Sequence, residues 1–157
     1  MSWFQQLVAA VFPRPSGLLV EEADPIRVEA PRSPEAFFRA LAALMSPDVV
    51  LYWEGPAERH LAAWLAQQSL EPRPAVAIGV VPVGDFYHIP LGEELLAWLA
   101  TRVARPGVVS GRVRLHVREG ERIVLEWRPA FGKSPLLLSR HLPAEQVRQF
   151  VELLSAQ

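Results

Sequence analysis

The sequence contains no cysteine, which excludes disulfide bonds, thiolate metal sites and a cysteine nucleophile. It also has no asparagine, a single threonine (Thr101) and a single lysine (Lys133) among its 16 basic residues. Few thermolabile residues and 15 prolines are typical of a thermophile, but a GC-rich bacterial genome gives the same bias towards arginine and proline. The 16 basic residues nearly balance 17 acidic ones, so the whole molecule has no net attraction for nucleic acid or an anionic membrane.

Motifs of the common enzyme classes are missing as well. The sequence has no HExxH, no Asp-x-Asp pair and no GxSxG. Gly79 and Gly84 lack the spacing of a dinucleotide-binding loop, and no phosphate-binding loop precedes Lys133. No stretch is long enough to span a bilayer, and the first residues lack the pattern of a signal peptide. We therefore expect a cytoplasmic protein with no cofactor, no bound metal and no membrane span.

The composition that remains is that of a globular protein, with 157 residues of which 50% are hydrophobic. Residues 111–131 alternate between apolar and polar with period two, which predicts an antiparallel hairpin with its turn at 119–121. The predicted register sets these residues opposite each other: Val117 with Ile123, Leu115 with Leu125, Val113 with Trp127, and Arg114 with Glu126. Trp98 and Trp127 are expected in the core, as large aromatic residues usually are.

The rest of the chain predicts an α/β or mixed α+β fold. Apolar runs at 49–53 and 75–81, separated by a helix that opens at Gly55, indicate a right-handed crossover and a parallel strand pair. Further helices are predicted at 33–45, at 92–104 and from residue 143, and a third strand beside the hairpin at 136–138. Together these elements predict a mixed parallel and antiparallel sheet of five or six strands, with a C-terminal antiparallel meander and helices packed on its faces.

The chain divides into three predicted segments. Residues 1–14 form an amphipathic helix with Trp3, Phe4 and Leu7 on one stripe. Residues 15–32 are an extended linker or two edge strands, at 18–20 and 26–28, and residues 33–157 form a single globular domain. The N-terminal helix packs on its own domain, on a partner protein or on a second copy of the chain, since an exposed stripe of this kind is an interaction patch.

The outer face of the hairpin is the first candidate site, because five arginines gather there with His116: Arg112, Arg114, Arg118, Arg122 and Arg128. Guanidinium groups bind phosphates and carboxylates through bidentate hydrogen bonds. A solvated, ion-paired strand face gives the same pattern, since Glu126 lies among the arginines. Nucleic acid is disfavoured as a partner, because no aromatic residues alternate with the arginines to stack on bases.

A second candidate site consists of Glu54, Asp85 and His88, near the carboxyl ends of the two predicted parallel strands. If these side chains converge, they offer a metal site or a general acid and base. Asp85 is equally explained by a tight turn. We expect a non-catalytic binding or interaction module for a protein partner or for self-association as a homodimer. The alternatives are a small metal-assisted hydrolase and an anion-binding protein.

Overall fold

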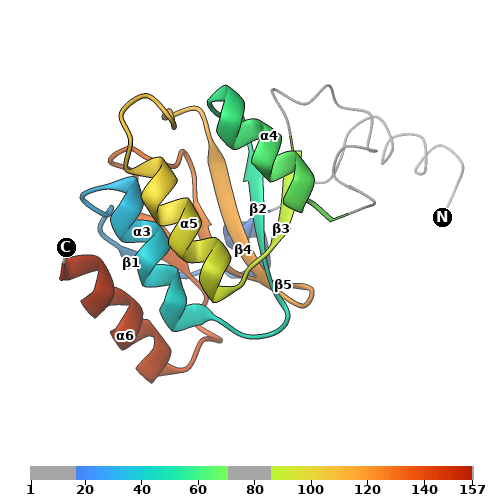
Figure 1. Ribbon diagram of the computed structural model, residues 1–157. Coiled ribbons are helices and arrows are strands. Elements are labelled where there is room, and N and C mark those ends of the chain that lie inside the picture. Colours follow the sequence, from blue (N-terminus) through green and yellow to red (C-terminus); the bar gives the residue numbers. More distant parts are fainter. Residues whose placement is uncertain (1–16, 71–85, 157) are drawn as a thin grey trace, which may run out of the picture.

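The computed structural model describes residues 17–70 and 86–156, which form a six-stranded antiparallel sheet with a layer of helices on one face (Figure 1). The elements in chain order are α2 (Leu18–Glu21), β1 (Ile26–Val28), α3 (Pro34–Ala40), the 3-10 helix η1 (Leu41–Leu44), β2 (Val49–Glu54), α4 (Arg59–Gln68), β3 (Phe86–Pro90), α5 (Glu93–Val103), β4 (Arg114–Glu119), β5 (Arg122–Trp127), β6 (Leu136–Leu138) and α6 (Ala144–Ser155). The strand order is β1-β6-β5-β4-β2-β3. The predicted α+β composition and strand number are therefore confirmed.

The prediction of a mixed sheet is wrong, because every neighbouring pair of strands in the described sheet is antiparallel. β2 pairs with β3 and with β4, while the predicted strand at 75–81 lies outside the described residues. The apolar run of β2 suggested burial on both faces, yet its burial alternates. Leu51 and Trp53 are fully buried, whereas Val50 and Tyr52 on the other face are half-buried. In its sequence, an antiparallel strand with an aromatic residue on its second face therefore looks like a parallel strand that is buried on both faces.

The hairpin of β4 and β5 is present, but in another register. Glu119 lies opposite Arg122, so the turn has two residues, and Gly120 adopts the positive φ of +62° that such a turn requires. A β-bulge then shifts the register by one more residue between Val117 and Arg118. The observed pairs are Leu115 with Trp127, His116 with Glu126, Val117 with Leu125 and Arg118 with Ile123. The two shifts together keep Leu115 and Val117 opposite apolar partners, so the apolar alternation did not distinguish the two registers.

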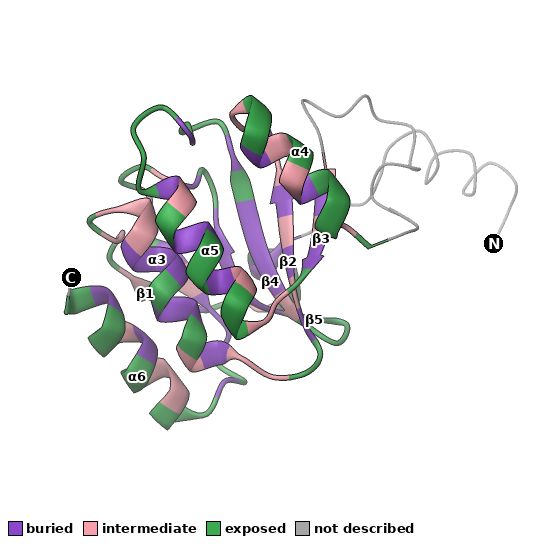
Figure 2. Ribbon diagram, in the orientation of Figure 1, coloured by how far each residue is buried: buried purple, intermediate pink, exposed green. Residues whose placement is uncertain are grey.

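The core lies between the sheet and helices α3, α4, α5 and α6 (Figure 2). Helix α3 begins at an N-cap, Ser33, whose hydroxyl accepts a hydrogen bond from the Ala36 amide at 3.1 Å. This start directs Phe37 and Phe38 into the core, where the Phe37 ring lies 4.9 Å from that of Trp127. Trp127 is 1% exposed, as expected, but the expectation for Trp98 is wrong, because that side chain is 38% exposed.

The second face of the sheet is covered in part by α2. The Leu18 amide donates a hydrogen bond of 2.5 Å to the Glu126 carboxylate, and the Ile123 amide donates one of 3.1 Å to Glu21. Segment 18–20 is therefore helical where we predicted an edge strand or an extended linker, because the Glu21 and Glu22 amides donate back to the Gly17 and Leu18 carbonyls and Glu126 accepts from the Leu18 amide. The other strand predicted in this part of the chain is present as the edge strand β1, which pairs with β6.

Gly55 follows β2 at a close approach to the segment before β4. Its φ is +128°, and a Cβ atom there would lie 2.9 Å from the Arg112 carbonyl oxygen and 3.0 Å from the Val113 Cα. We expect Gly55→Ala to lower the free energy of unfolding by about 1–3 kcal/mol through backbone strain and this clash. Gly111→Ala is the matched control, because a Cβ at Gly111 meets nothing within 4 Å. Equal urea midpoints for the two variants would contradict the prediction.

Candidate functional site

A row of polar and aromatic residues crosses the second face of the sheet. The register places His88 on β3 opposite Tyr52 on β2, Tyr52 opposite His116 on β4, and His116 opposite Glu126 on β5. The Tyr52 and His116 rings are stacked, with centroids 4.3 Å apart and planes 11° from parallel. The His88 ring lies 5.2 Å from Tyr52 at 52°. Four consecutive strands therefore contribute one side chain each to a continuous row.

Three arginines surround this row. Arg114 and Arg118 lie two residues on either side of His116 along β4, so they share its face. Arg118 donates from Nε to His116 Nε2 at 3.2 Å and from a terminal nitrogen to the Glu121 carbonyl at 3.1 Å. Arg128, just after β5, pairs through Nε with Glu126 Oε1 at 3.1 Å. We call these residues the polar face: Tyr52, Glu54, His88, Arg114, His116, Arg118, Glu126 and Arg128.

The Tyr52 and His116 rings at the centre of the polar face are uncharged. Burial, together with the positive charges of Arg118 and Arg128 and the neighbouring His88, lowers the pKa of His116 to about 3. Since Nε2 of the neutral imidazole accepts from Arg118, the ring proton is assigned to Nδ1. Burial also raises the pKa of the Tyr52 phenol above its usual range, and the charge of Glu54 raises it further. The charges of this face are therefore those of its three arginines and of the carboxylates Glu54 and Glu126.

The structure brings together three of the five arginines singled out from the sequence. Arg114, Arg118 and Arg128 all act electrostatically on Tyr52. Arg112 lies before β4 on an exposed turn, and the Arg122 side chain belongs to the opposite face, because its neighbour Ile123 pairs with Arg118. The displaced register and the bulge are the physical reason that Arg122 departs from the predicted group.

The structure describes two of the three residues of the second candidate site. Glu54 and His88 share the polar face, on neighbouring strands and two residue pairs apart in the register, whereas Asp85 lies outside the described residues. Over residues 17–70 and 86–156, no group of three or more histidine, aspartate and glutamate side chains is placed to hold a metal ion. The residues of the predicted N-terminal helix, Trp3, Phe4 and Leu7, also fall outside the described ranges, so its role stays a prediction.

Sequence reasoning missed Tyr52 and Phe86 as members of this site. The Phe86 ring lies 5.8 Å from that of Tyr52, so aromatic rings do accompany the arginines. They lie on β2 and β3, so they do not belong to the alternating segment at 111–131 that contains Arg114, Arg118 and Arg128. The only sign in the sequence is that Tyr52 occupies an alternate position of the apolar run at 49–53. This position indicates membership of the polar face only once β2 is known to pair with β4.

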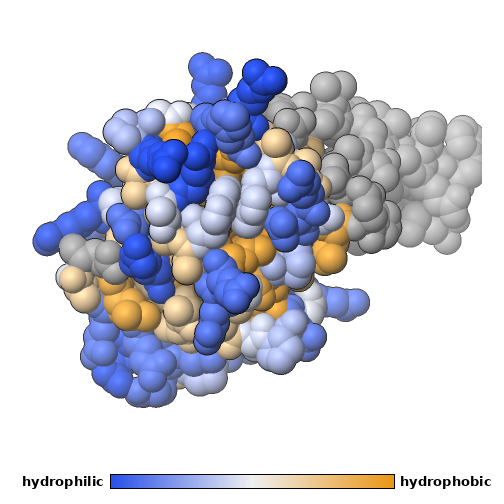
Figure 3. Space-filling model, viewed as in Figure 1, coloured by the Kyte–Doolittle hydropathy of each residue, from blue (hydrophilic) through white to orange (hydrophobic). Residues whose placement is uncertain are grey.

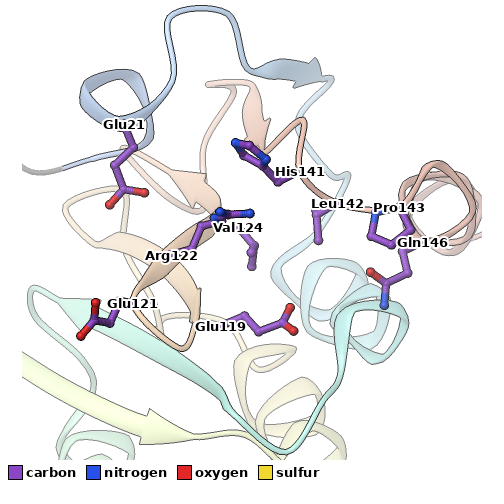
Figure 4. Close-up of a pocket in the computed structure, with 9 residues that line it drawn as sticks. All are labelled: Glu21, Glu119, Glu121, Arg122, Val124, His141, Leu142, Pro143 and Gln146. Atoms are coloured by element: carbon purple, nitrogen blue, oxygen red, sulfur yellow. The ribbon is translucent and has the colours of Figure 1, made fainter.

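A separate surface cavity of about 710 Å³ lies at the turn between β4 and β5 (Figure 4). Its lining residues are Glu21, Glu119, Glu121, Arg122, Val124, His141, Leu142, Pro143 and Gln146. The three carboxylates stand apart around the rim in Figure 4, and Glu21 already accepts the Ile123 amide. The cavity is charged, but its side chains do not converge on one point as the ligands of an ion would.

Comparison with known proteins finds no match to this chain: no family model, no curated protein and no solved structure. Within the part of the chain that the structure describes, no helix has the length and apolar character needed to cross a membrane. Function is therefore inferred from the geometry and charge of the polar face.

Proposed function

We propose that the chain is a non-catalytic binding module whose polar face binds an acidic, extended segment of a partner protein. The observation that supports this function is the positive charge of Arg114 and Arg118 beside the neutral Tyr52 and His116 rings. Of the two carboxylates on this face, Glu126 accepts from the Leu18 amide and pairs with Arg128, and Glu54 lies opposite Arg114 in the register. Arg114 is exposed and has no ion pair within the described residues, so its guanidinium is available to a ligand.

The geometry of the rings favours a charged ligand over a nucleobase. Tyr52 and His116 are stacked on each other across neighbouring strands, and His88 approaches Tyr52 from the next strand. The faces of these rings are therefore occupied by one another, whereas base stacking needs a free aromatic face. Hydrogen bonds and ion pairs from the arginines remain as the means of recognition.

The spacing of the arginines favours an extended ligand over a small anion. Arg114 and Arg118 are four residues apart on β4, which corresponds to about 13 Å along a strand. One phosphate or carboxylate does not bridge that distance. A peptide in extended conformation repeats its side chains on one face roughly every 7 Å, so acidic residues along it reach both arginines.

The proposal is tested by the fluorescence anisotropy of a dye-labelled hexaglutamate peptide, with hexaglutamine as the neutral control. We expect Arg114→Gln to weaken hexaglutamate binding about fivefold, as the loss of about 1 kcal/mol from one exposed ion pair implies. Arg122→Gln is the matched control and leaves the affinity unchanged, because Arg122 belongs to the opposite face. We also expect the affinity of the wild type for hexaglutamate to fall as the salt concentration rises from about 0.05 to about 0.2 M, because salt screens ion pairs between exposed charges.

Two results would overturn this function. One is equal binding of hexaglutamate and hexaglutamine, which would show that charge is not recognised. The other is an equal loss of affinity in Arg114→Gln and Arg122→Gln, which would show general attraction to arginine and no specific face. Inorganic phosphate that competes fully at low millimolar concentration would identify a small-anion site and contradict the extended ligand.

A further inference from the structure

Two tryptophans form a partly exposed stack in the helix layer, on the face of the sheet opposite the polar face. Trp64 on α4 and Trp98 on α5 have ring centroids 3.9 Å apart, with planes 18° from parallel. Trp98 is 38% exposed, whereas Trp53 and Trp127 are at most 1% exposed. Tryptophan is enriched near the centres of protein interfaces, and apolar patches on a surface mark interaction sites.

A groove of about 710 Å³ lies beside this stack, between the C-terminal half of α4 and the start of α5. Its lining residues are Trp64, Gln68, Pro90, Leu91, Gly92, Glu93, Glu94, Leu95 and Trp98. Figure 3 views this helix-covered side of the molecule and shows apolar patches among charged side chains. The lining of the groove therefore combines apolar side chains with two glutamates and one glutamine.

The two helices that form the groove are tied together at their other ends. Glu58 caps α4 by accepting from the His60 and Leu61 amides, and it pairs with Arg102 of α5 at 2.8 Å. The His60 amide and the Arg102 guanidinium lower the pKa of Glu58 to about 2, so the carboxylate is charged at neutral pH. Arg102 is thereby engaged within its own chain. The Glu58–Arg102 ion pair and the Trp64–Trp98 stack therefore join α4 to α5, the two helices that form the groove, at two separate points.

The exposed stripe of α5 has opposite charges at its two ends. Glu94, Trp98, Thr101 and, just past the end of the helix, Arg105 follow one another at spacings of four, three and four residues, and all four are exposed. Trp98 lies near the middle, and Glu94 and Arg105 are separated by roughly 16 Å at the rise of an α-helix. When two such stripes pack antiparallel, each Glu94 faces the Arg105 of the other copy. The stripe is thus complementary to itself.

We propose that a second copy of this chain docks on the groove and on the exposed stripe of α5, forming a two-fold symmetric dimer. The α5 helices pack antiparallel about Trp98, which covers the exposed indole, and two equivalent ion pairs join Glu94 to Arg105 across the interface. Such self-complementarity is what a two-fold interface requires, since the same patch must meet itself. The polar face remains uncovered on the far side of each copy.

Charge reversal in the full chain tests this interface by sedimentation velocity across a range of protein concentrations. Glu94→Arg and Arg105→Glu each place like charges opposite one another, and we expect each variant to dissociate at least about tenfold more readily than the wild type. An equimolar mixture of the two variants restores the dimer. The first variant is basic at both positions and the second is acidic at both, so opposite charges meet at each end of the mixed interface. Far-ultraviolet circular dichroism confirms that each variant is folded.

Mixing Glu94→Arg with Arg105→Glu tests the antiparallel pairing of Glu94 with Arg105 specifically. A wild type that sediments as a monomer at every concentration would overturn the proposal. Single variants that dimerise as the wild type does would also overturn it, and would direct attention to other surfaces, such as the predicted helix at residues 1–14. Single variants that are monomeric and stay monomeric when mixed would exclude the antiparallel pairing of Glu94 with Arg105.

Discussion

Trp127→Ala is expected to lower the free energy of unfolding by about 3–5 kcal/mol, the range for a fully buried large aromatic residue. The Trp127 ring lies 4.9 Å from Phe37 and 5.3 Å from Phe131, so its loss opens a cavity between α3 and the end of β5. Trp127 Nε1 also donates to the Ser134 carbonyl at 3.0 Å, and the alanine variant leaves that carbonyl without its donor.

Urea unfolding at one fixed protein concentration measures this effect, because a dimer would otherwise change the apparent stability. Leu153→Ala is the matched control, since Leu153 is 37% exposed on α6 and its truncation costs less than about 1 kcal/mol. Trp127→Phe is expected to fall between the two, since it keeps most of the ring but loses the hydrogen bond. A loss below about 1 kcal/mol in Trp127→Ala would contradict the packing described here.

Helix positions could be predicted from the sequence because their ends have local chemical signals. Ser33 and Pro34 mark the start of α3, and Gly92 and Pro143 precede α5 and α6. The start of α4 was placed too early, at Gly55, because the capping residue is Glu58, whose side chain reaches the His60 and Leu61 amides. A glutamate is a less common cap than serine or aspartate, so the local signal was weak.

The direction of strand pairing could not be predicted from local patterns. Periodicity reports which residues of a strand are buried, but it does not report which strand lies beside it. β2 pairs antiparallel with both β3 and β4, and Tyr52 gives β2 the appearance of a strand buried on both faces. Both features arise from the long-range arrangement of the sheet, which the apolar pattern of one strand does not contain.

The candidate site could be predicted only in part, because it is assembled across strands whose pairing the sequence does not show. Arg114 and Arg118 share a face because alternation within one strand is a local property. Arg128 retains that face because the two-residue turn and the bulge together shift the register by an even number of residues. Tyr52 joins them only through the pairing of β2 with β4, which links strands that are far apart in the sequence. A site assembled across strands is therefore present in the sequence only as separate fragments.

Acidification below pH 6.5 is expected to destabilise the fold through His116, by about 1 kcal/mol for each pH unit. An unfolded histidine takes up a proton near its usual pKa of about 6.5. The folded imidazole resists protonation until its pKa of about 3, because it is 5% exposed and faces Arg118, Arg128 and His88. Above about pH 6.5 both states are neutral and the full stability is present. As the pH falls towards about 3, only the unfolded state gains the proton, so stability is progressively lost.

Urea unfolding at pH 7.5, 6.5 and 5.5 separates the titration of His116 from that of the carboxylates, whose usual pKa values are about 4. His116→Gln removes the titrating ring, so its stability should fall less steeply over this range than that of the wild type, whatever its absolute value. His60→Gln is the matched control, because His60 is exposed on α4 and does not belong to the polar face. Equal slopes for the wild type and His116→Gln would show that His116 is not held neutral between Tyr52 and the arginines. The same neutrality underlies the proposed site, because a charged imidazole would repel Arg118 and disrupt the hydrogen bond that orients its guanidinium.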